Sequence, residues 1–202
     1  MNALSRSILS LCALAAMAAG PSARDARDQA HADPARPASK DSALPIGPIG
    51  PLDRQDAVDV SRAVCLNVAA PMLLSSALAG LHKASLRIVH ISSGAARTAY
   101  SGWSVYCATK AALDHHARAV ALDGAAGLRI CSVAPGVIDT DMQAEIRAAS
   151  PGVFPMQDRF IALKQDGQLA SPDEVAARLV RYVLGKGFGA EPVADLRSLP
   201  DA

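Results

Sequence analysis

Tyr106 and Lys110 stand four residues apart in the stretch GWSVYCATKAALD, which runs from residue 102 to residue 114. If this stretch is helical, the two side chains share one face of the helix. A free phenol has a pKa of about 10 and is a poor proton donor at neutral pH. A neighbouring ammonium group stabilises the phenolate and lowers that pKa, which would let Tyr106 protonate a carbonyl oxygen. The same spacing also arises in ordinary helices, so the pair alone leaves both interpretations open.

Two earlier residues could assist the same chemistry. Ser93 ends the apolar run LRIVHISS, thirteen residues before Tyr106, and its hydroxyl could donate to the same carbonyl oxygen or simply complete a turn. Pro71 has no N–H, so the carbonyl of Asn67 loses its helical partner and should bind another donor, such as water. The alternative for Asn67 is a helix that Pro71 only kinks.

A fourth candidate is the stretch VAPGVIDTDM. Pro135 and Gly136 turn the chain at the end of an apolar run, and Asp139 or Thr140 could cap a following helix. Exposed backbone and a hydroxyl at such a turn could hold a ligand that carries an amide. As a bare pattern, the stretch is a strand–turn–helix junction.

Alternating helices and strands would position these residues. Apolar periodicity predicts helices over 56–81, 104–122 and 171–185, and β-branched runs predict strands over 86–93, 128–136 and 192–197. The third helix opens with a capping box from Ser171 to Glu174. This alternation predicts an α/β fold with a parallel sheet, whose ligands bind at the carboxyl ends of the strands. Both Ser93 and Pro135 fall at such ends.

Residues 1–45 differ from the rest of the chain. The run ILSLCALAAMAAG after Arg6 has the outline of a secretory signal but is too short to span a bilayer. Residues 21–45 are rich in Ala, Asp, Arg and Pro and are expected to form a disordered linker. We therefore expect one folded domain over residues 46–202.

Composition excludes several function classes. The 202 residues carry a net charge of +1 and only 3% aromatic residues, which argues against a nucleic-acid partner. The four cysteines form no C-x-x-C pair, and His115–His116 has no third ligand in view. We expect no metal site, and a partly exposed helix face for the histidine pair. His90, within the strand before Ser93, is expected to be hydrogen-bonded inside the sheet.

The ordered set of Asn67, Ser93, YCATK and PGVIDT resembles the signature of the classical short-chain dehydrogenase/reductase family. The stretches GWSVYCATKAALD, DTDMQ, LKQDG and VADLR are similar to its sepiapterin reductase and benzil reductase branch. This resemblance implies the C-terminal part of a Rossmann-type, doubly wound parallel sheet with flanking helices. It also implies NADP-dependent reduction of a ketone or vicinal diketone in the cytoplasm, with NADPH as cofactor.

The resemblance further implies a role for each site residue. Tyr106 would be the general acid, Lys110 would lower its pKa and hold the nicotinamide ribose, and Ser93 would orient the substrate carbonyl. Asn67 would hold a water linked to Lys110. The remaining implied contacts are with the cofactor, at Pro135, Gly136, Ile138 and Thr140, and with the substrate, at Trp103 and Asp195.

One part of the family pattern is absent from this sequence. The motif T-G-x-x-x-G-x-G, which holds the cofactor pyrophosphate, does not occur, nor does the N-N-A-G segment. We therefore expect a truncated fold that is a weak or inactive reductase. Two alternatives are a non-catalytic remnant that acts as an interaction module and a secreted binding domain. The family's usual homodimer contact would involve the helices near 58–80 and 104–122, with no membrane partner.

Overall fold

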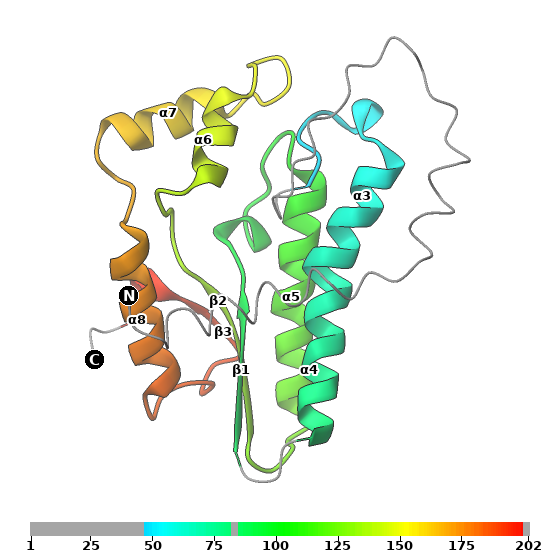
Figure 1. The fold of residues 1–202 in the computed structure, drawn as a ribbon, viewed down its shortest axis with the longest axis vertical. Helices are drawn as coiled ribbons and strands as arrows, with labels where there is room; N and C mark the ends of the chain where they lie inside the picture. The colour runs from blue at the N-terminus through cyan, green and yellow to red at the C-terminus, as the bar shows by residue number, and fades with distance from the viewer. Residues whose placement is uncertain (1–46, 82–84, 200–202) are drawn as a thin grey trace.

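A three-stranded parallel sheet forms the centre of the computed structural model, which describes residues 47–81 and 85–199 (Figure 1). The strands have the order β1-β2-β3 and span Leu86–Ile91, Leu128–Ala134 and Val193–Asp195. Their pairings are parallel, which confirms the α/β prediction. The expectations for residues 1–45 lie outside the described residues.

The helices cover both faces of the sheet (Figure 1). One face carries α3 and α4 in line, with α5 beside them, and α8 covers the other face. The short helices α6 and α7 lie beyond the carboxyl ends of the strands. The α-helices span Ala57–Val64 (α3), Ala70–Leu81 (α4), Ser104–Leu122 (α5), Asp141–Ala148 (α6), Gln157–Gln165 (α7) and Pro172–Leu184 (α8). The 3-10 turns span Leu52–Arg54 (η2), Gly94–Ala96 (η4) and Leu196–Ser198 (η5).

Local side-chain contacts set several helix ends. The Asp56 carboxylate accepts hydrogen bonds from the first turn of α3, as an N-cap should. The Ser171 hydroxyl accepts from the Glu174 N–H at 3.2 Å, which confirms the predicted start of α8. The predicted helix over 104–122 is also confirmed. The last strand is shorter than predicted because Asp195 begins η5, and its carboxylate accepts from the Arg197 N–H.

The predicted helix over 56–81 is interrupted by one wider turn, η3, at Cys65–Ala69. There the Ala70 N–H donates to the Cys65 carbonyl, five residues earlier, so the turn is π-helical. Pro71 follows at once and has no N–H to donate to Asn67. The wider turn lets the chain continue through this gap, with the Asn67 side chain buried.

Three groups of buried side chains hold the elements together. Ile88 and Ile130 pack with Ala117 between the sheet and α5, while Val133 packs with Val175 between the sheet and α8. The third group is aromatic and lies around α5, α6 and α7; it contains Trp103, Tyr106, Phe154 and Phe160, with Tyr100 against it. Scarce aromatic residues are thus concentrated next to the candidate catalytic tyrosine.

Two surfaces of the described residues are apolar and open. In this part of the chain β1 pairs only with β2, and Ile91 at its end is 38% exposed. On α4, Leu73 and Leu81 are 70% and 76% exposed. By length and composition alone, the stretch Ala57–Leu81 could also cross a membrane, although a soluble protein's helix can meet the same criteria.

Candidate active site

Tyr106 and Lys110 lie on the buried face of α5, as their spacing predicted. The Lys110 Nζ donates a hydrogen bond of 2.9 Å to the carbonyl of Ile91, the last residue of β1. The same Nζ lies 5.6 Å from the centroid of the Tyr106 ring. This pair therefore fixes the first turns of α5 against the carboxyl end of β1.

The electrostatics of Tyr106 differ from the expectation. Burial raises the pKa of this phenol, and a hydrogen bond with the Ser93 side chain offsets only part of that rise. The expected net lowering of this pKa is therefore not observed, while the contribution of Lys110 stays a prediction. The physical reason is that the phenol lies in an aromatic cluster, where the phenolate loses more hydration than its neighbours replace.

Ser93 completes the turn after β1, and its contact with a substrate carbonyl stays a prediction. Its Oγ accepts a hydrogen bond from the Ala95 N–H at 3.2 Å and so caps η4. Its side chain also forms the hydrogen bond with Tyr106. The turn that ends β1 thus holds the Ser93 hydroxyl near enough to Tyr106 to affect the pKa of the phenol.

Asn67 lies on η3, which packs against α5. The wider turn buries its side chain to 4% exposure on the helix that neighbours Tyr106 and Lys110. The structure therefore brings all four predicted catalytic residues to the same side of the sheet. The water expected at Asn67 stays a prediction.

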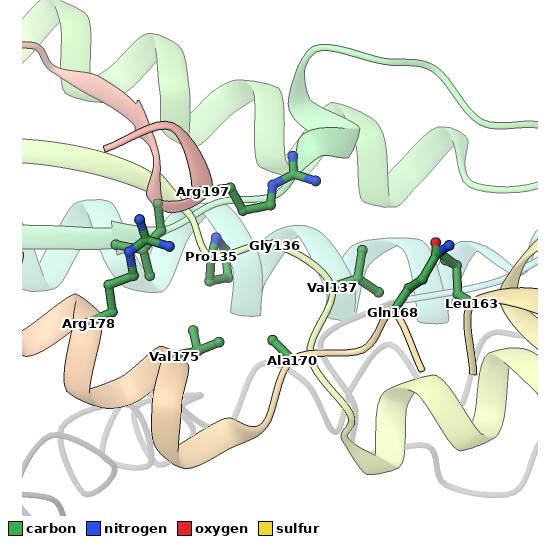
Figure 2. A pocket seen from close by; sticks show the side chains of 10 residues that line it. Pro135, Gly136, Val137, Leu163, Gln168, Ala170, Val175, Arg178 and Arg197 are labelled. Atoms are coloured by element: carbon green, nitrogen blue, oxygen red, sulfur yellow. The ribbon is translucent and has the colours of Figure 1, made fainter. Parts of the chain in front are cut away.

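The turn after β2 borders a cavity of about 230 Å³ (Figure 2). Gly136 has a φ of 93°, a backbone conformation that favours glycine, and a Cβ there would lie 3.1 Å from the Cδ of Arg197, which would have to shift. The residues that line the cavity are Pro135, Gly136, Val137, Leu163, Gln168, Ala170, Val175, Arg178, Leu196 and Arg197.

Ile138 and Thr140 do not line that cavity. Ile138 forms a single parallel bridge with Ala170, and Thr140 is the N-cap residue of α6. The Thr140 side chain makes no capping hydrogen bond, while the Asp139 carboxylate pairs with Lys164. Of the four predicted cofactor contacts on this loop, only Pro135 and Gly136 line the cavity; contact of Ile138 and Thr140 with a cofactor stays a prediction.

The two predicted substrate residues already have protein partners. Trp103 is 5% exposed and stacks on Phe154 with ring centroids 4.8 Å apart; it also meets the Tyr106 ring edge-on at 5.3 Å. Asp195 accepts three hydrogen bonds from Arg197. Arg97 Nη2 also lies 3.5 Å from its Oδ2, and the hydrogen bonds and charges of these arginines lower the pKa of Asp195.

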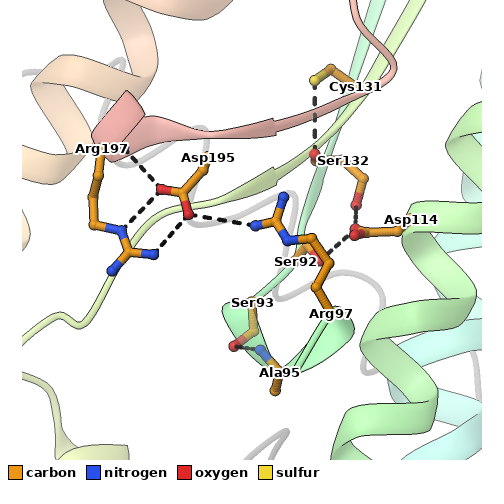
Figure 3. Close-up of polar contacts among 9 residues, drawn as sticks. All are labelled: Ser92, Ser93, Ala95, Arg97, Asp114, Cys131, Ser132, Asp195 and Arg197. Carbon is orange, nitrogen blue, oxygen red and sulfur yellow. Dashed lines mark hydrogen bonds and ion pairs between the residues drawn. The ribbon is translucent and has the colours of Figure 1, made fainter. Parts of the chain in front are cut away.

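Sequence reasoning missed Asp114, which is 3% exposed. Its Oδ1 accepts hydrogen bonds from the Ser92 hydroxyl at 2.6 Å and the Ser132 hydroxyl at 2.8 Å, linking α5 to β2 and the end of β1 (Figure 3). Its Oδ2 has no hydrogen-bond partner among the described residues. The available signal was spacing, because Asp114 follows Tyr106 and Lys110 at successive four-residue steps.

The histidines form a pair between β1 and α5. The His90 Nε2 lies 3.2 Å from the His116 Nδ1, so the expectation of a bond within the sheet is wrong. Burial, His116 and Lys110 together lower the pKa of His90 to about 4, which keeps it neutral at physiological pH. Within residues 47–81 and 85–199, no group of three or more His, Cys, Asp or Glu side chains could hold a metal ion.

Comparison with known proteins places this geometry in a family. The model of the family described as short chain dehydrogenase matches residues 46–151, which is just over half of the chain. This chain belongs to the short-chain dehydrogenase family. The resemblance to this family seen in the sequence is therefore confirmed.

Its curated relatives include benzil reductases and sepiapterin reductases. The benzil reductase ((S)-benzoin forming) of Bacillus cereus is 41% identical over 127 residues, which are 60% of this chain and 51% of the relative. The sepiapterin reductase of Meriones unguiculatus is 32% identical over 132 residues, or 63% and 50% of the two chains. The chain thus spans about half the length of these relatives.

Solved structures agree on the fold. A short-chain dehydrogenase/reductase from Saccharomyces cerevisiae is 28% identical, with a TM-score of 0.65 over 76% of this chain and 62% of that one. A short-chain dehydrogenase from Shigella flexneri, solved in complex with NADP, is 22% identical with a TM-score of 0.60, over 75% and 59% of the two chains. The described residues therefore form part of a Rossmann-like fold.

Proposed function

We propose that this chain carries the catalytic part of an NADP-dependent carbonyl reductase that acts on a ketone or vicinal diketone. The observation that supports this most directly is the joint position of the Ser93 hydroxyl, the Tyr106 phenol and the Lys110 ammonium. They meet at the carboxyl end of β1, where ligands of such sheets bind. The similarity to benzil reductases supports the choice of substrate class.

Each of these side chains would have its own role in the reaction. NADPH, when bound, would supply a hydride to the carbonyl carbon. Ser93 would hold the carbonyl oxygen, and Tyr106 would give its proton to that oxygen as negative charge develops. Because burial raises the phenol's pKa, Tyr106 is protonated at neutral pH, which is the form that a proton donor needs. Lys110 would stabilise the phenolate that the transfer leaves behind.

The cofactor contacts on this chain are those of the nicotinamide side. Pro135 and Gly136 present a backbone turn beside the cavity. Lys110 would donate a hydrogen bond to a ribose hydroxyl of the bound cofactor. Since the given sequence contains no T-G-x-x-x-G-x-G motif, we propose that these 202 residues alone bind NADPH weakly. NADPH as cofactor also favours a cytoplasmic location.

Replacing Tyr106 by Phe tests the proposed reaction. We expect the rate of NADPH oxidation with benzil to fall by a factor of roughly 10²–10⁴, because the variant has no proton to donate. Rates are measured with the purified 202-residue chain at high NADPH concentration. Tyr182→Phe is the matched control, since that phenol contacts Cys131 on the far side of the sheet. Equal rates in the two variants would reject Tyr106 as the acid.

We also propose self-association through α4 and α5. The supporting observation is the row of exposed leucines on α4, which includes Leu73 and Leu81. Leu73→Glu is expected to convert a dimer to a monomer in sedimentation measurements, whereas Leu184→Glu, on α8 and 68% exposed, should leave the dimer intact. A chain that is already monomeric would contradict the proposal. A dimer without reductase activity would instead favour the interaction module.

A further inference from the structure

Two arginines and one aspartate form a charged group at the carboxyl ends of the strands (Figure 3). We call Arg97, Asp195 and Arg197 the arginine cluster. Asp195 ends β3, Arg197 lies in η5, and Arg97 follows η4, the turn that Ser93 caps. The cluster therefore joins the segment after β1 to the segment after β3, across the end of β2.

The charges of the arginine cluster do not cancel. One carboxylate faces two guanidinium groups, which leaves one net positive charge. Asp195 is the most enclosed member, with its side chain 17% exposed, whereas the side chains of Arg97 and Arg197 are 40% and 61% exposed. The surplus positive charge thus faces solvent, where a ligand can reach it.

The two arginines hold Asp195 differently. Arg197 contacts it through Nε at 3.0 Å and through Nη2 at 2.7 Å, a bidentate pair. Arg97 contacts it only through Nη2, at 3.5 Å. The Nε and Nη1 of Arg97 have no acceptor within the part of the chain that the structure describes. Arg97 therefore keeps N–H donors for a second carboxylate, which planar guanidinium groups bind in a forked geometry.

The position of the cluster connects it to the candidate catalytic site. Arg97 comes four residues after Ser93 and directly follows the turn that the Ser93 hydroxyl caps. On the opposite side, Arg197 packs on Gly136 and lines the cavity beside the turn after β2. Arg97 is thus held on the same short turn as the Ser93 hydroxyl that would hold a carbonyl.

From these contacts we infer that the arginine cluster binds the carboxylate of an oxo acid. The preferred substrate is then a vicinal dicarbonyl compound in which the second carbonyl belongs to a carboxylate, such as an arylglyoxylate. This inference rests on the proposed reductase function and narrows its substrate class. Asp195 serves to orient Arg97 and does not itself contact substrate, because its oxygens are already occupied by guanidinium donors.

Equilibrium binding of a matched pair of compounds tests the inference. Benzoylformate and its methyl ester share the ketone and the ring, and only the acid is charged. The single tryptophan, Trp103, lies against Tyr106 and reports binding to the full chain by fluorescence. At low salt we expect the acid to bind about tenfold more tightly than the ester, and this ratio should shrink at high salt.

Variants of the arginine cluster show which side chain causes the preference for the acid. Arg97→Gln should bring the ratio of acid to ester affinity close to one, while Arg118→Gln, an exposed arginine on α5, should leave it unchanged. Asp195→Asn should increase the ratio, because it removes the negative charge that opposes a ligand carboxylate while its amide oxygen can still accept a hydrogen bond from a guanidinium group. Equal binding of acid and ester by the unaltered chain, no binding of either, or an unchanged ratio in Arg97→Gln would overturn the inference.

Two further measurements separate this inference from other outcomes. Tyr106→Phe should keep the preference for the acid. If the unaltered chain shows no reductase activity but still prefers the acid, the proposed reaction is wrong and the proposed carboxylate site stands. If Arg97→Gln weakens NADPH binding and leaves the oxo acid unaffected, the cluster binds a cofactor phosphate, and the inference is wrong.

Discussion

Asp114 and Asp195 are both carboxylates near the carboxyl end of the sheet, yet their surroundings are opposite. Asp114 is 3% exposed and accepts hydrogen bonds from two neutral hydroxyls. Asp195 lies near the surface and is held by two cations. These different surroundings give the two carboxylates different roles. A buried carboxylate with hydroxyl donors ties elements together, whereas a surface carboxylate with charged donors sets the charge that a ligand meets.

The energetic consequences also differ. Buried donors that lose their acceptor cannot turn to water, so each costs about 1–3 kcal/mol of folding free energy. Surface ion pairs contribute only about 0–1 kcal/mol, because water and salt screen them. Replacing Asp114 on α5 should therefore lower the free energy of unfolding much more than replacing Asp195 on β3. Replacing Asp195 should in turn change ligand binding more than replacing Asp114.

The largest effect is expected from Asp114→Ala. The hydroxyls of Ser92 and Ser132 both lose their acceptor, so the free energy of unfolding should fall by roughly 3–4 kcal/mol. Urea denaturation measures the change. Asp123→Ala, at the exposed C-terminal end of the same helix, is the control and should cost well under 1 kcal/mol. A small loss for Asp114→Ala would mean that these hydroxyls find other acceptors and would remove the contrast with Asp195.

The second-largest effect is expected from the protonation of His90 at low pH. Its pKa is about 4 in the folded chain and about 6.5 when unfolded, so between these values the unfolded chain binds the extra proton. Stability should therefore fall as the pH drops from about 6.5 towards 4, by up to roughly 3 kcal/mol. Urea midpoints across this range would show it.

His90→Gln should flatten that dependence, because glutamine does not titrate and can still bond to His116. His115→Gln, on the exposed side of α5, should leave the dependence intact. An equal slope in the unaltered chain and in His90→Gln would show that other groups cause the acid sensitivity. The buried face of α5 would then not be the acid-labile region.

The smallest stability effect is expected from Asp195→Asn. Its pKa is lowered in the folded chain, so its contribution is present above the unfolded value of about 3.9 and is lost as the pH falls through the folded value. At neutral pH the substitution should cost less than about 1 kcal/mol, and high salt should reduce that cost. A larger loss that salt does not alter would give Asp195 a structural role like that of Asp114.

Sequence alone predicted the features that depend on local spacing. The α5 helix, the shared face of Tyr106 and Lys110 and the Ser171 cap follow from residues within one or two turns. The two carboxylate networks could not be found in this way, because Asp114 meets Ser132 across 18 residues and Arg97 meets Asp195 across 98. Such contacts depend on strand register and on how a helix is rotated against the sheet.

The pKa of Tyr106 shows the same limit. Spacing placed Lys110 correctly, but the phenol's burial depends on Phe154 and Phe160, which come from a loop and a helix about fifty residues later. The sequence pattern had indicated no helix at Gln157–Gln165. Desolvation depends on how the whole cluster packs. The spacing of Tyr106 and Lys110 alone therefore predicts a lowered pKa for the phenol, whereas its burial raises that pKa.

The wide turn η3 also constrains how the chain can change in length. A π-helical turn holds one residue more than the α-helix around it, and each α-helical residue advances the helix by about 100°. The wide turn absorbs this extra residue, so α3 and α4 keep the rotational phase of a continuous helix one residue shorter. Deleting a residue between Cys65 and Ala69 would remove the wide turn, yet Pro71 would still leave a helical carbonyl without its N–H donor. The extra residue thus carries the helix past the proline and keeps both segments in register with α5.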